Sequence, residues 1–158
     1  MINLKIKTYV ITISKKFPSH HPRKGEPTNF YPQIIDDIKL HTIRGNYKFW
    51  KKRIDEVNAG LAMLSLREWS GKPYCSSQTE LACFFRGEVG IQPINLTVGW
   101  FGKTRGILAY VKLDDFETRL IDVKELVKND GLSLENFYGW FNKPLNDPAI
   151  IHFTNFRY

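Results

Sequence analysis

Hydrophobic and polar residues alternate along several segments of the chain, as they do in half-buried β-strands. Four segments with this pattern are predicted to be strands: 3–13, 62–69, 79–85 and 107–113. The apolar run at 149–156 is predicted to be the last strand. A Ser-Gly-Lys-Pro turn at 70–73 separates the second strand from the third, so these two are expected to pair antiparallel. Residues 86–99 give no clear pattern, because Gly and Pro interrupt them.

Between the strands, apolar residues recur with the helical period of about 3.6 residues. Four helices are predicted from this period, at 31–38, 47–58, 123–128 and 134–141. Ile34, Ile35 and Ile38 are expected to form the apolar face of the first helix, and Ile54 and Val57 that of the second.

Strands at both ends and in the middle, with helices in the connections, predict the α+β class. The simplest packing of these elements is a small mixed β-barrel decorated with helices. A length of 158 residues suggests a single domain over 1–158. The Gly-rich fingerprint of a Rossmann sheet and the P-loop are both missing, which argues against dinucleotide-binding enzymes and nucleotide triphosphatases.

The positive charge of the chain is concentrated in its first third. The net charge is +7, yet residues 1–53 hold 12 Lys and Arg against 3 Asp and Glu, and the remainder is slightly acidic. Four prolines and several basic residues predict a long basic loop over 14–32. Such an excess of positive charge on one part of a protein suggests a polyanionic partner.

Several other classes of protein are not expected. The sequence has no run of 18 apolar residues, so no membrane span is predicted. The beginning of the chain lacks the continuous apolar stretch of a secretory signal, and Cys75 and Cys83 are too few for a disulfide framework, which favours a cytoplasmic protein with reduced thiols. The histidines and cysteines lack the spacing of metal ligands, so neither a metal nor another cofactor is expected.

The densest candidate for chemistry is the pattern Lys39-x-x-Thr42-x-Arg44, which is expected to lie in a turn after the first helix. A Thr hydroxyl is a weak nucleophile that needs a base, and a Lys that is desolvated or close to other cations has a lowered pKa and can serve as that base. Arg44 is suited to hold a phosphate or a carbonyl oxygen. The alternative is structural: Thr42 caps the helix that follows, and both cations are solvated.

The six residues from Lys39 to Arg44, Lys-Leu-His-Thr-Ile-Arg, resemble the Lys-x-x-Thr-Ile-Arg signature of ASCH domains. These belong to the PUA-like superfamily of small barrels, which often bind RNA. The resemblance points to the small bacterial N4-acetylcytidine amidohydrolases, in which the Lys is taken as base, the Thr as nucleophile, and a later acidic residue completes the site. It implies the same roles for Lys39 and Thr42.

The end of the chain is also similar to that family. Residues 129–137, followed by the last predicted strand, resemble its acidic residue and a helix that Ser133 would cap. The resemblance implies that Asp130 takes the place of the family's Glu, although an Asp is one methylene shorter. Glu135 lies inside the predicted helix and fits less well. The chain differs from these hydrolases in its basic loop and in an extra stretch around 70–105.

Further candidate ligand-binding residues surround this motif. His41 lies next to Thr42, and Lys48 and Lys52 belong to a basic stripe on the second helix, in a segment (39–53) that contains no acidic residue. The stripe is interpreted as an anion-facing surface, with an ordinary solvated helix face as the alternative.

The turn between the two antiparallel strands offers another candidate surface. Arg67, Lys72 and Tyr74 have the side chains needed to stack a base and hold a phosphate. Alternatively, this is simply the end of a hairpin, with Trp69 packed inward and covered by Tyr74.

Three functions are compatible with the sequence. The leading hypothesis is a domain that binds RNA or a modified nucleoside in a basic cleft framed by Lys39, Thr42, Arg44 and Asp130. The second is a metal-independent amidohydrolase acting on N4-acylated cytidine, or a nuclease or other hydrolase acting on RNA. The third is a protein-interaction module whose basic face meets an acidic partner.

Overall fold

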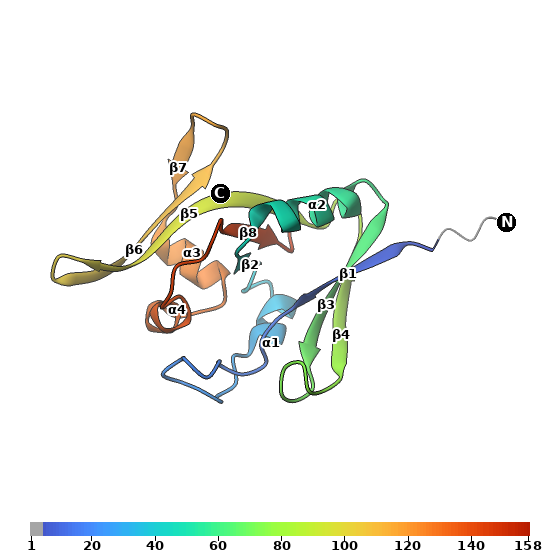
Figure 1. Ribbon diagram of the computed structural model, residues 1–158, viewed down its shortest axis with the longest axis horizontal. Helices are drawn as coiled ribbons and strands as arrows, with labels where there is room; N and C mark the ends of the chain where they lie inside the picture. The colour runs from blue at the N-terminus through green and yellow to red at the C-terminus, as the bar shows by residue number, and fades with distance from the viewer. Residues whose placement is uncertain (1–4) are drawn as a thin grey trace.

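Residues 5–158 are described by the computed structural model, and they form an α+β structure (Figure 1), which confirms the predicted class. In chain order the elements are β1 (Lys7–Thr12), α1 (Phe30–Ile35), β2 (His41–Arg44), α2 (Tyr47–Asn58), β3 (Ala62–Trp69), β4 (Gln78–Phe84), β5 (Gly90–Phe101), β6 (Thr104–Lys112), β7 (Thr118–Leu120), α3 (Val123–Asn129), α4 (Leu134–Trp140) and β8 (Ala149–His152). The beginning of the predicted strand 3–13 lies outside the described residues.

The strands are divided between two hydrogen-bonded sheets. The smaller sheet has the order β1-β3-β4, with β1 parallel to β3 and β4 antiparallel to β3, as the turn at 70–73 predicts. The larger sheet has the order β2-β8-β5-β6-β7 and is antiparallel throughout. The long strand β5 pairs with β8 through its first residues and with β6 through the rest, so it links the body of this sheet to a projecting hairpin (Figure 1).

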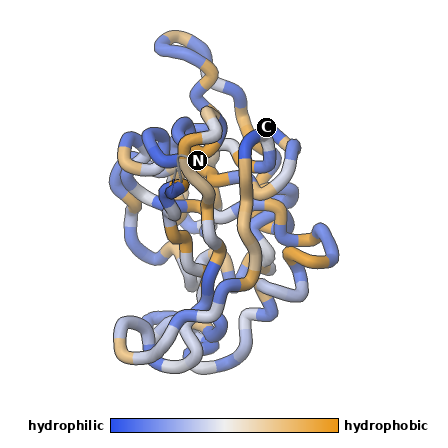
Figure 2. Tube along the Cα trace, turned by 90° about the vertical axis from the view of Figure 1, so that its right-hand side faces the viewer, coloured by the Kyte–Doolittle hydropathy of each residue, from blue (hydrophilic) through white to orange (hydrophobic). Residues whose placement is uncertain are grey.

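The hydrophobic core lies between these sheets and the helices. Helix α2 has the predicted bounds, and its Ile54 and Val57 are buried, as the helical period indicates. Figure 2 shows the hydrophobic stretches along the strands and the hydrophilic ones mainly in the connections. Among the described residues, no helix combines the length and the apolar character needed to cross a membrane.

The first helix differs from its prediction in the residues that it buries. Phe30 is the buried residue of α1, while Ile35 and Ile38 are exposed. The helix ends at Ile35, and Asp37 adopts a positive φ of 54°. This turn takes Ile38 out of the helical register, so the expected face of three isoleucines does not form.

The segment from Lys39 to Gly45 was expected to be a turn, and this expectation is wrong. Four of its residues form β2, which pairs antiparallel with β8 from His41 opposite His152 to Arg44 opposite Ala149. The helix that follows is capped by the Asn46 side chain, which accepts a hydrogen bond from Phe49 N at 3.4 Å. The alternative role of Thr42 as a helix cap is therefore also excluded.

Two further strands depart from the sequence pattern. The short strand β7 was not predicted, and β8 ends at His152 rather than at residue 156. Beyond β8, Phe153 N donates to Leu40 O at 3.0 Å, which ties the end of the chain to the residue between Lys39 and β2. The Ser133 cap of α4 is confirmed, because its side chain accepts from Asn136 N at 3.2 Å.

Candidate functional site

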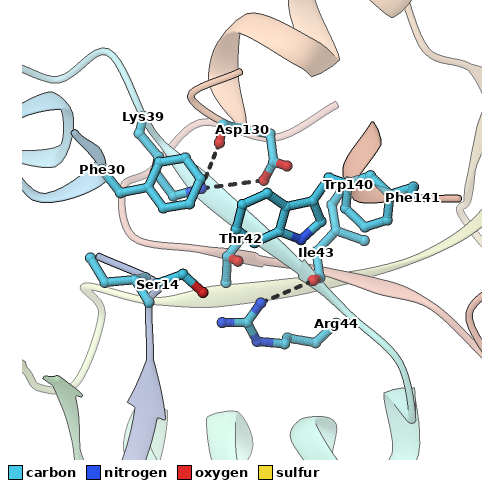
Figure 3. A pocket seen from close by; sticks show the side chains of 10 residues that line it. Ser14, Phe30, Lys39, Thr42, Ile43, Arg44, Asp130, Trp140 and Phe141 are labelled. Carbon is cyan, nitrogen blue, oxygen red and sulfur yellow. Dashed lines mark hydrogen bonds and ion pairs between the residues drawn. The ribbon is translucent and has the colours of Figure 1, made fainter. Parts of the chain in front are cut away.

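The candidate site is a pocket where β2, α1, α4 and the end of α3 meet (Figure 3). Thr42 and Arg44 are two residues apart on β2 and therefore share one face of the strand. Lys39 comes just before this strand, and Asp130 follows the last turn of α3. The pocket is lined by Ile13, Ser14, Phe30, Lys39, Thr42, Ile43, Arg44, Asp130, Trp140 and Phe141. The structure thus brings together the four residues that the motif and the resemblance single out.

Lys39 and Asp130 form a buried ion pair on one side of this pocket. Lys39 is only 2% exposed, and its Nζ donates to the backbone O of Asp130 at 2.6 Å and to Oδ1 at 3.4 Å. The same nitrogen lies 4.3 Å from the centre of the Phe30 ring. Burial lowers the pKa of the Lys39 amine, Asp130 opposes this change, and the positive charge of Arg44 adds to it. The amine is thus easier to deprotonate than an ordinary lysine.

Close backbone contacts hold the pair in place. Leu40 N donates to Asn129 O at 2.8 Å, so the chain on either side of the ion pair is bonded directly. Gly131 has a φ of 81°, and a Cβ at this position would lie 3.1 Å from Cδ of Lys39. The lysine can therefore cross the end of α3 this closely only because residue 131 has no side chain.

Arg44 lies on the opposite side of Thr42 from Lys39 (Figure 3). Its Nη2 donates to Thr12 O and its Nη1 to Ile43 O at 3.3 Å, so strand β1 helps to orient the guanidinium. Burial lowers the pKa of this group, and Asp130 opposes the change. A guanidinium carries five N–H donors, and these two bonds leave others for an anion or a carbonyl oxygen in the pocket.

The Thr42 hydroxyl lies between the two cations (Figure 3). Thr42 is buried, yet the hydrogen bonds of Lys39 Nζ go to Asp130 and none joins it to Thr42 in the described chain. A direct hydrogen bond that would pass a proton from Thr42 to Lys39 is thus not formed in this arrangement.

His41 lies behind the pocket rather than in its lining. Its ring is fully buried, with Nε2 at 2.7 Å from Tyr158 Oη and Nδ1 at 3.5 Å from Asp130 Oδ1. Burial lowers its pKa, so the ring is neutral near pH 7. His41 is thus placed to support Asp130, and the hypothesis of a direct substrate contact gains no support from the geometry.

A larger groove adjoins the inner pocket. The inner pocket has a volume of about 20 Å³, and the groove about 350 Å³. Both are lined by Ile43, Arg44, Trp140 and Phe141, so these four residues form the wall that the two cavities share. His20, Gly45 and residues 142–145 complete the groove. Its size suits a ring, whereas the inner pocket has room for only a few atoms.

Aromatic packing fixes the wall between pocket and groove. The Trp140 ring lies 5.4 Å from the Phe30 ring and 5.9 Å from the Phe17 ring. His20 Nε2 is 3.1 Å from Trp140 O, and His21 Nε2 is 2.9 Å from Asn136 O. The basic loop 14–32 is thereby bonded to α4 beside the groove.

The second helix contributes little to this site. Lys48 and Lys52 are exposed on α2 and line neither the pocket nor the groove. Within the same stripe, Lys51 Nζ pairs with Asp55 at 2.6 Å, and Arg53 lies over the rings of Phe49 and Tyr9. The stripe is thus partly neutralised and partly used in packing, and it resembles an ordinary solvated face more than the sequence suggested.

The hairpin between β3 and β4 is a separate surface. Arg67 Nε donates to Ser65 Oγ at 2.8 Å, and its Nη2 lies 3.9 Å from Glu80, so this guanidinium is occupied within its own sheet. Lys72 is exposed in the turn, and Tyr74 is exposed beside Trp69, with 5.2 Å between the ring centres. None of these residues lines the pocket or the groove.

Six pocket residues were not predicted as site residues: Ile13, Ser14, Phe30, Ile43, Trp140 and Phe141. Ser14 and Phe30 carry no pattern that links them to the motif, since they lie at the edges of an irregular loop. Trp140 and Phe141 were predicted only as residues of an amphipathic helix, and nothing in the sequence placed them beside Asp130. Within residues 5–158, no group of three or more His, Cys, Asp or Glu side chains is arranged to hold a metal ion.

Comparisons with protein-family models, with curated proteins and with solved structures gave no match. The function of the protein is therefore inferred from the geometry of the pocket and from the Lys39-x-x-Thr42-x-Arg44 motif.

Proposed function

We propose that this protein is an ASCH-type domain that binds RNA or a modified nucleoside in the pocket between Lys39 and Arg44. One observation carries the proposal. Lys39 and Asp130 are 91 residues apart in the chain, yet they meet in one buried pocket with Thr42 and Arg44. A buried charged pair is costly, and ionisable groups with a shifted pKa in a pocket are candidates for a functional site. A PUA-like barrel built from the two sheets is part of the same proposal.

The shape of the cavity suggests how a nucleoside would lie. The ring occupies the groove against Trp140, and an exocyclic group enters the small inner pocket. There Arg44 donates to an acceptor oxygen, while Asp130 favours the charged form of Lys39 beside it. Hydrogen-bond donors at the bottom of an apolar cavity are typical of sites that select one small polar group.

The test is a titration of wild type with cytidine, with N4-acetylcytidine and with a single-stranded RNA oligomer at low salt. Arg44→Lys should weaken nucleoside binding by about tenfold or more, since it removes a planar fork of donors. Lys48→Ala, on the exposed face of α2, serves as the matched control and should leave nucleoside affinity unchanged. If neither nucleoside nor RNA binds, the proposal is wrong.

Catalysis is the second candidate, and the position of Thr42 between two cations favours it. Lys39, as the neutral amine, would take the proton of the Thr42 hydroxyl while Oγ1 attacks the acyl carbon of an N4-acylated cytidine. Arg44 would stabilise the oxyanion, and the protonated Lys39, held by Asp130, would give its proton to the departing N4 amine. Water would then hydrolyse the acyl-threonine ester.

Hydrolysis of N4-acetylcytidine tests this candidate directly. Thr42→Ala and Lys39→Met should each reduce kcat/KM by a hundredfold or more, while Thr42→Ser should retain part of the activity because it keeps a hydroxyl. Activity that survives both Thr42→Ala and Lys39→Met would exclude this mechanism but not ligand binding.

A further inference from the structure

The hairpin of β5 and β6 projects as an arm from the larger sheet (Figure 1). Eight residue pairs form its ladder, from Ile94 opposite Val111 to Phe101 opposite Thr104. Strand β7 pairs with β6 only between Tyr110 and Lys112, so within the described residues the outer part of the arm has no further strand beside it. The arm therefore presents its tip to solvent on several sides.

Large aromatic side chains are exposed at this tip. Trp100 is 72% exposed and Phe101 is 48% exposed, and the register places Trp100 opposite Arg105. Lys103 lies between them in the turn, and both cations are exposed. Exposed aromatic groups of this size usually mark an interaction surface. Consecutive strand residues point to opposite faces, so Trp100 and Phe101 flank the two sides of the tip, and a flexible chain that wraps around the tip can contact both rings and the two cations.

The charge of the arm identifies the kind of partner. Residues 89–113 contain Lys103, Arg105 and Lys112 and no acidic residue. A surface with only positive charge and exposed rings complements a chain of phosphates that carries unstacked bases.

The arm is also joined to the helix that walls the proposed pocket. Tyr138 Oη donates to Arg105 O at 3.2 Å, and the Arg105 guanidinium lies 4.3 Å from the Tyr138 ring centre. Tyr138 and Trp140 belong to the same helix, α4. A ligand longer than a nucleoside, with one end in the groove at Trp140, can therefore extend along α4 towards the arm.

We propose that the tip of the β5–β6 arm is a second contact surface for single-stranded RNA. Trp100 and Phe101 stack on bases, and Lys103 and Arg105 hold the phosphates between them. The proposal deepens the proposed function, on which it rests for the course of the RNA from pocket to arm. It distinguishes an RNA chain from a free nucleoside as the ligand.

The experiment measures binding of the full chain to a fluorescent 12-nucleotide RNA without secondary structure, by fluorescence polarisation at several salt concentrations. Trp100→Ala and Phe101→Ala should each weaken binding about five- to hundredfold, the range for loss of one stacked base. Lys103→Ala should weaken it less and reduce the slope of log K against log salt by about 0.7.

Phe116→Ala is the matched control. Phe116 is an aromatic residue that is 100% exposed in another turn, between β6 and β7 at the top of Figure 2, but its neighbours Asp114, Asp115 and Glu117 are acidic. The acidic turn should repel RNA, so this variant should bind as wild type does. Unchanged near-ultraviolet circular dichroism of the arm variants, apart from the lost Trp100 signal, shows that they fold.

The outcomes separate the arm from the pocket. If the arm variants lose RNA affinity and keep the nucleoside affinity of wild type, the proposal is supported. If wild type binds nucleoside but not RNA, or if the arm variants bind RNA as tightly as wild type, the arm proposal is wrong and the pocket proposal stands. If RNA binds through the arm and no nucleoside binds, the pocket proposal fails instead. A dimer that dissociates in the Trp100→Ala variant, with RNA affinity unchanged, would identify the arm as a self-association surface and overturn the proposal.

Discussion

Lys39 and Asp130 are buried together, and Asp130 opposes the fall that burial causes in the pKa of Lys39. Removal of one partner from such a pair leaves an uncompensated charge in the interior, and this costs more than the pair itself contributes. The stability of the pocket therefore depends on both members of this ion pair. The same dependence makes the pair accessible to experiment even without a known ligand.

Asp130→Asn retains the shape of the side chain and removes its charge. We expect a loss of about 3–5 kcal/mol in the free energy of unfolding at pH 7, since the Lys39 ammonium then has no counter-charge. Because this change lowers the pKa of Lys39 further, the loss should become smaller as the pH rises towards 10.5, where the amine is neutral in the unfolded chain as well. Urea unfolding at pH 7 and pH 10 measures both values. In the double variant with Lys39→Met, the two losses should not add, and additive losses would show that the pair is not coupled.

His41 and Tyr158 form the layer behind this pair, and their hydrogen bonds determine which His41 nitrogen carries the proton. Asn129 Nδ2 donates to Tyr158 Oη at 3.1 Å, so the phenol is free to donate to His41 Nε2 at 2.7 Å. The proton of the neutral imidazole is then on Nδ1, which faces Asp130 Oδ1. At 3.5 Å this nitrogen forms no hydrogen bond with the acid, so its contact with Asp130 is electrostatic.

Long-range proton–nitrogen NMR correlations should therefore show His41 as the neutral Nδ1–H tautomer at pH 7. In Tyr158→Phe the Nε2 atom loses its donor, and a mixture of tautomers is expected. Tyr138→Phe removes a buried phenol whose hydroxyl bonds to Arg105 O, away from His41, and should leave the tautomer unchanged. A protonated His41, or an Nε2–H tautomer in the wild type, would contradict this interpretation.

At the scale of secondary-structure elements, the sequence is informative where one regular period covers a whole element. The bounds of α2 and β3 agree with their predictions because each has an uninterrupted pattern that matches its buried face. Strand β5 was missed because Gly90, Pro93 and Gly99 interrupt its alternation. Strand β2 was taken for a turn because it breaks the helical period of the residues before it. Its polar side chains are buried or half-buried, with partners from elsewhere in the chain, Tyr158 Oη for His41 and Thr12 O for Arg44.

The same limit applies to the candidate site. The motif identifies Lys39, Thr42 and Arg44 because they are close in sequence, and the resemblance adds Asp130. Trp140 could be recognised only as a residue of an amphipathic helix, since nothing local shows that α4 packs beside β2. Residues that form a pocket through tertiary packing leave no period in the sequence.

Gly131, in the turn after α3, packs against Lys39 of the pocket, and this contact can be tested by substitution. Gly131 and Gly60 both have positive φ, 81° and 78°, but only a Cβ at Gly131 would press on Lys39. Alanine at either position should cost about 1 kcal/mol for the left-handed backbone. Gly131→Ala should cost more, and should also change the rate at which Lys39 reacts with an amine-directed reagent. Equal losses in the two variants, measured by denaturant unfolding, would show that the contact with Lys39 has no energetic weight.

At the scale of the whole molecule, the burial of histidines couples the stability of the fold to pH. His41 and His152 face each other across β2 and β8, with 5.6 Å between their ring centres. Burial lowers the pKa of His152 to about 3, and competition with His41 for a proton and the charge of Arg157 add to the effect. Burial likewise lowers the pKa of His41. In the unfolded chain both rings take up a proton near pH 6.5.

The free energy of unfolding should therefore show no loss from these two histidines above pH 6.5. It should decrease as the pH falls towards 4, because there the unfolded chain binds more protons than the folded one. Each of the two buried rings contributes about 1.4 kcal/mol per pH unit to this slope below pH 6.5. His152→Asn should lower stability at pH 7 through the loss of its bond to Gln92 Oε1, yet reduce the acid slope by one such contribution. Urea unfolding between pH 7 and pH 4 measures the slopes of the wild type and of this variant. Equal slopes would mean that His152 binds a proton as readily in the folded protein as in the unfolded chain.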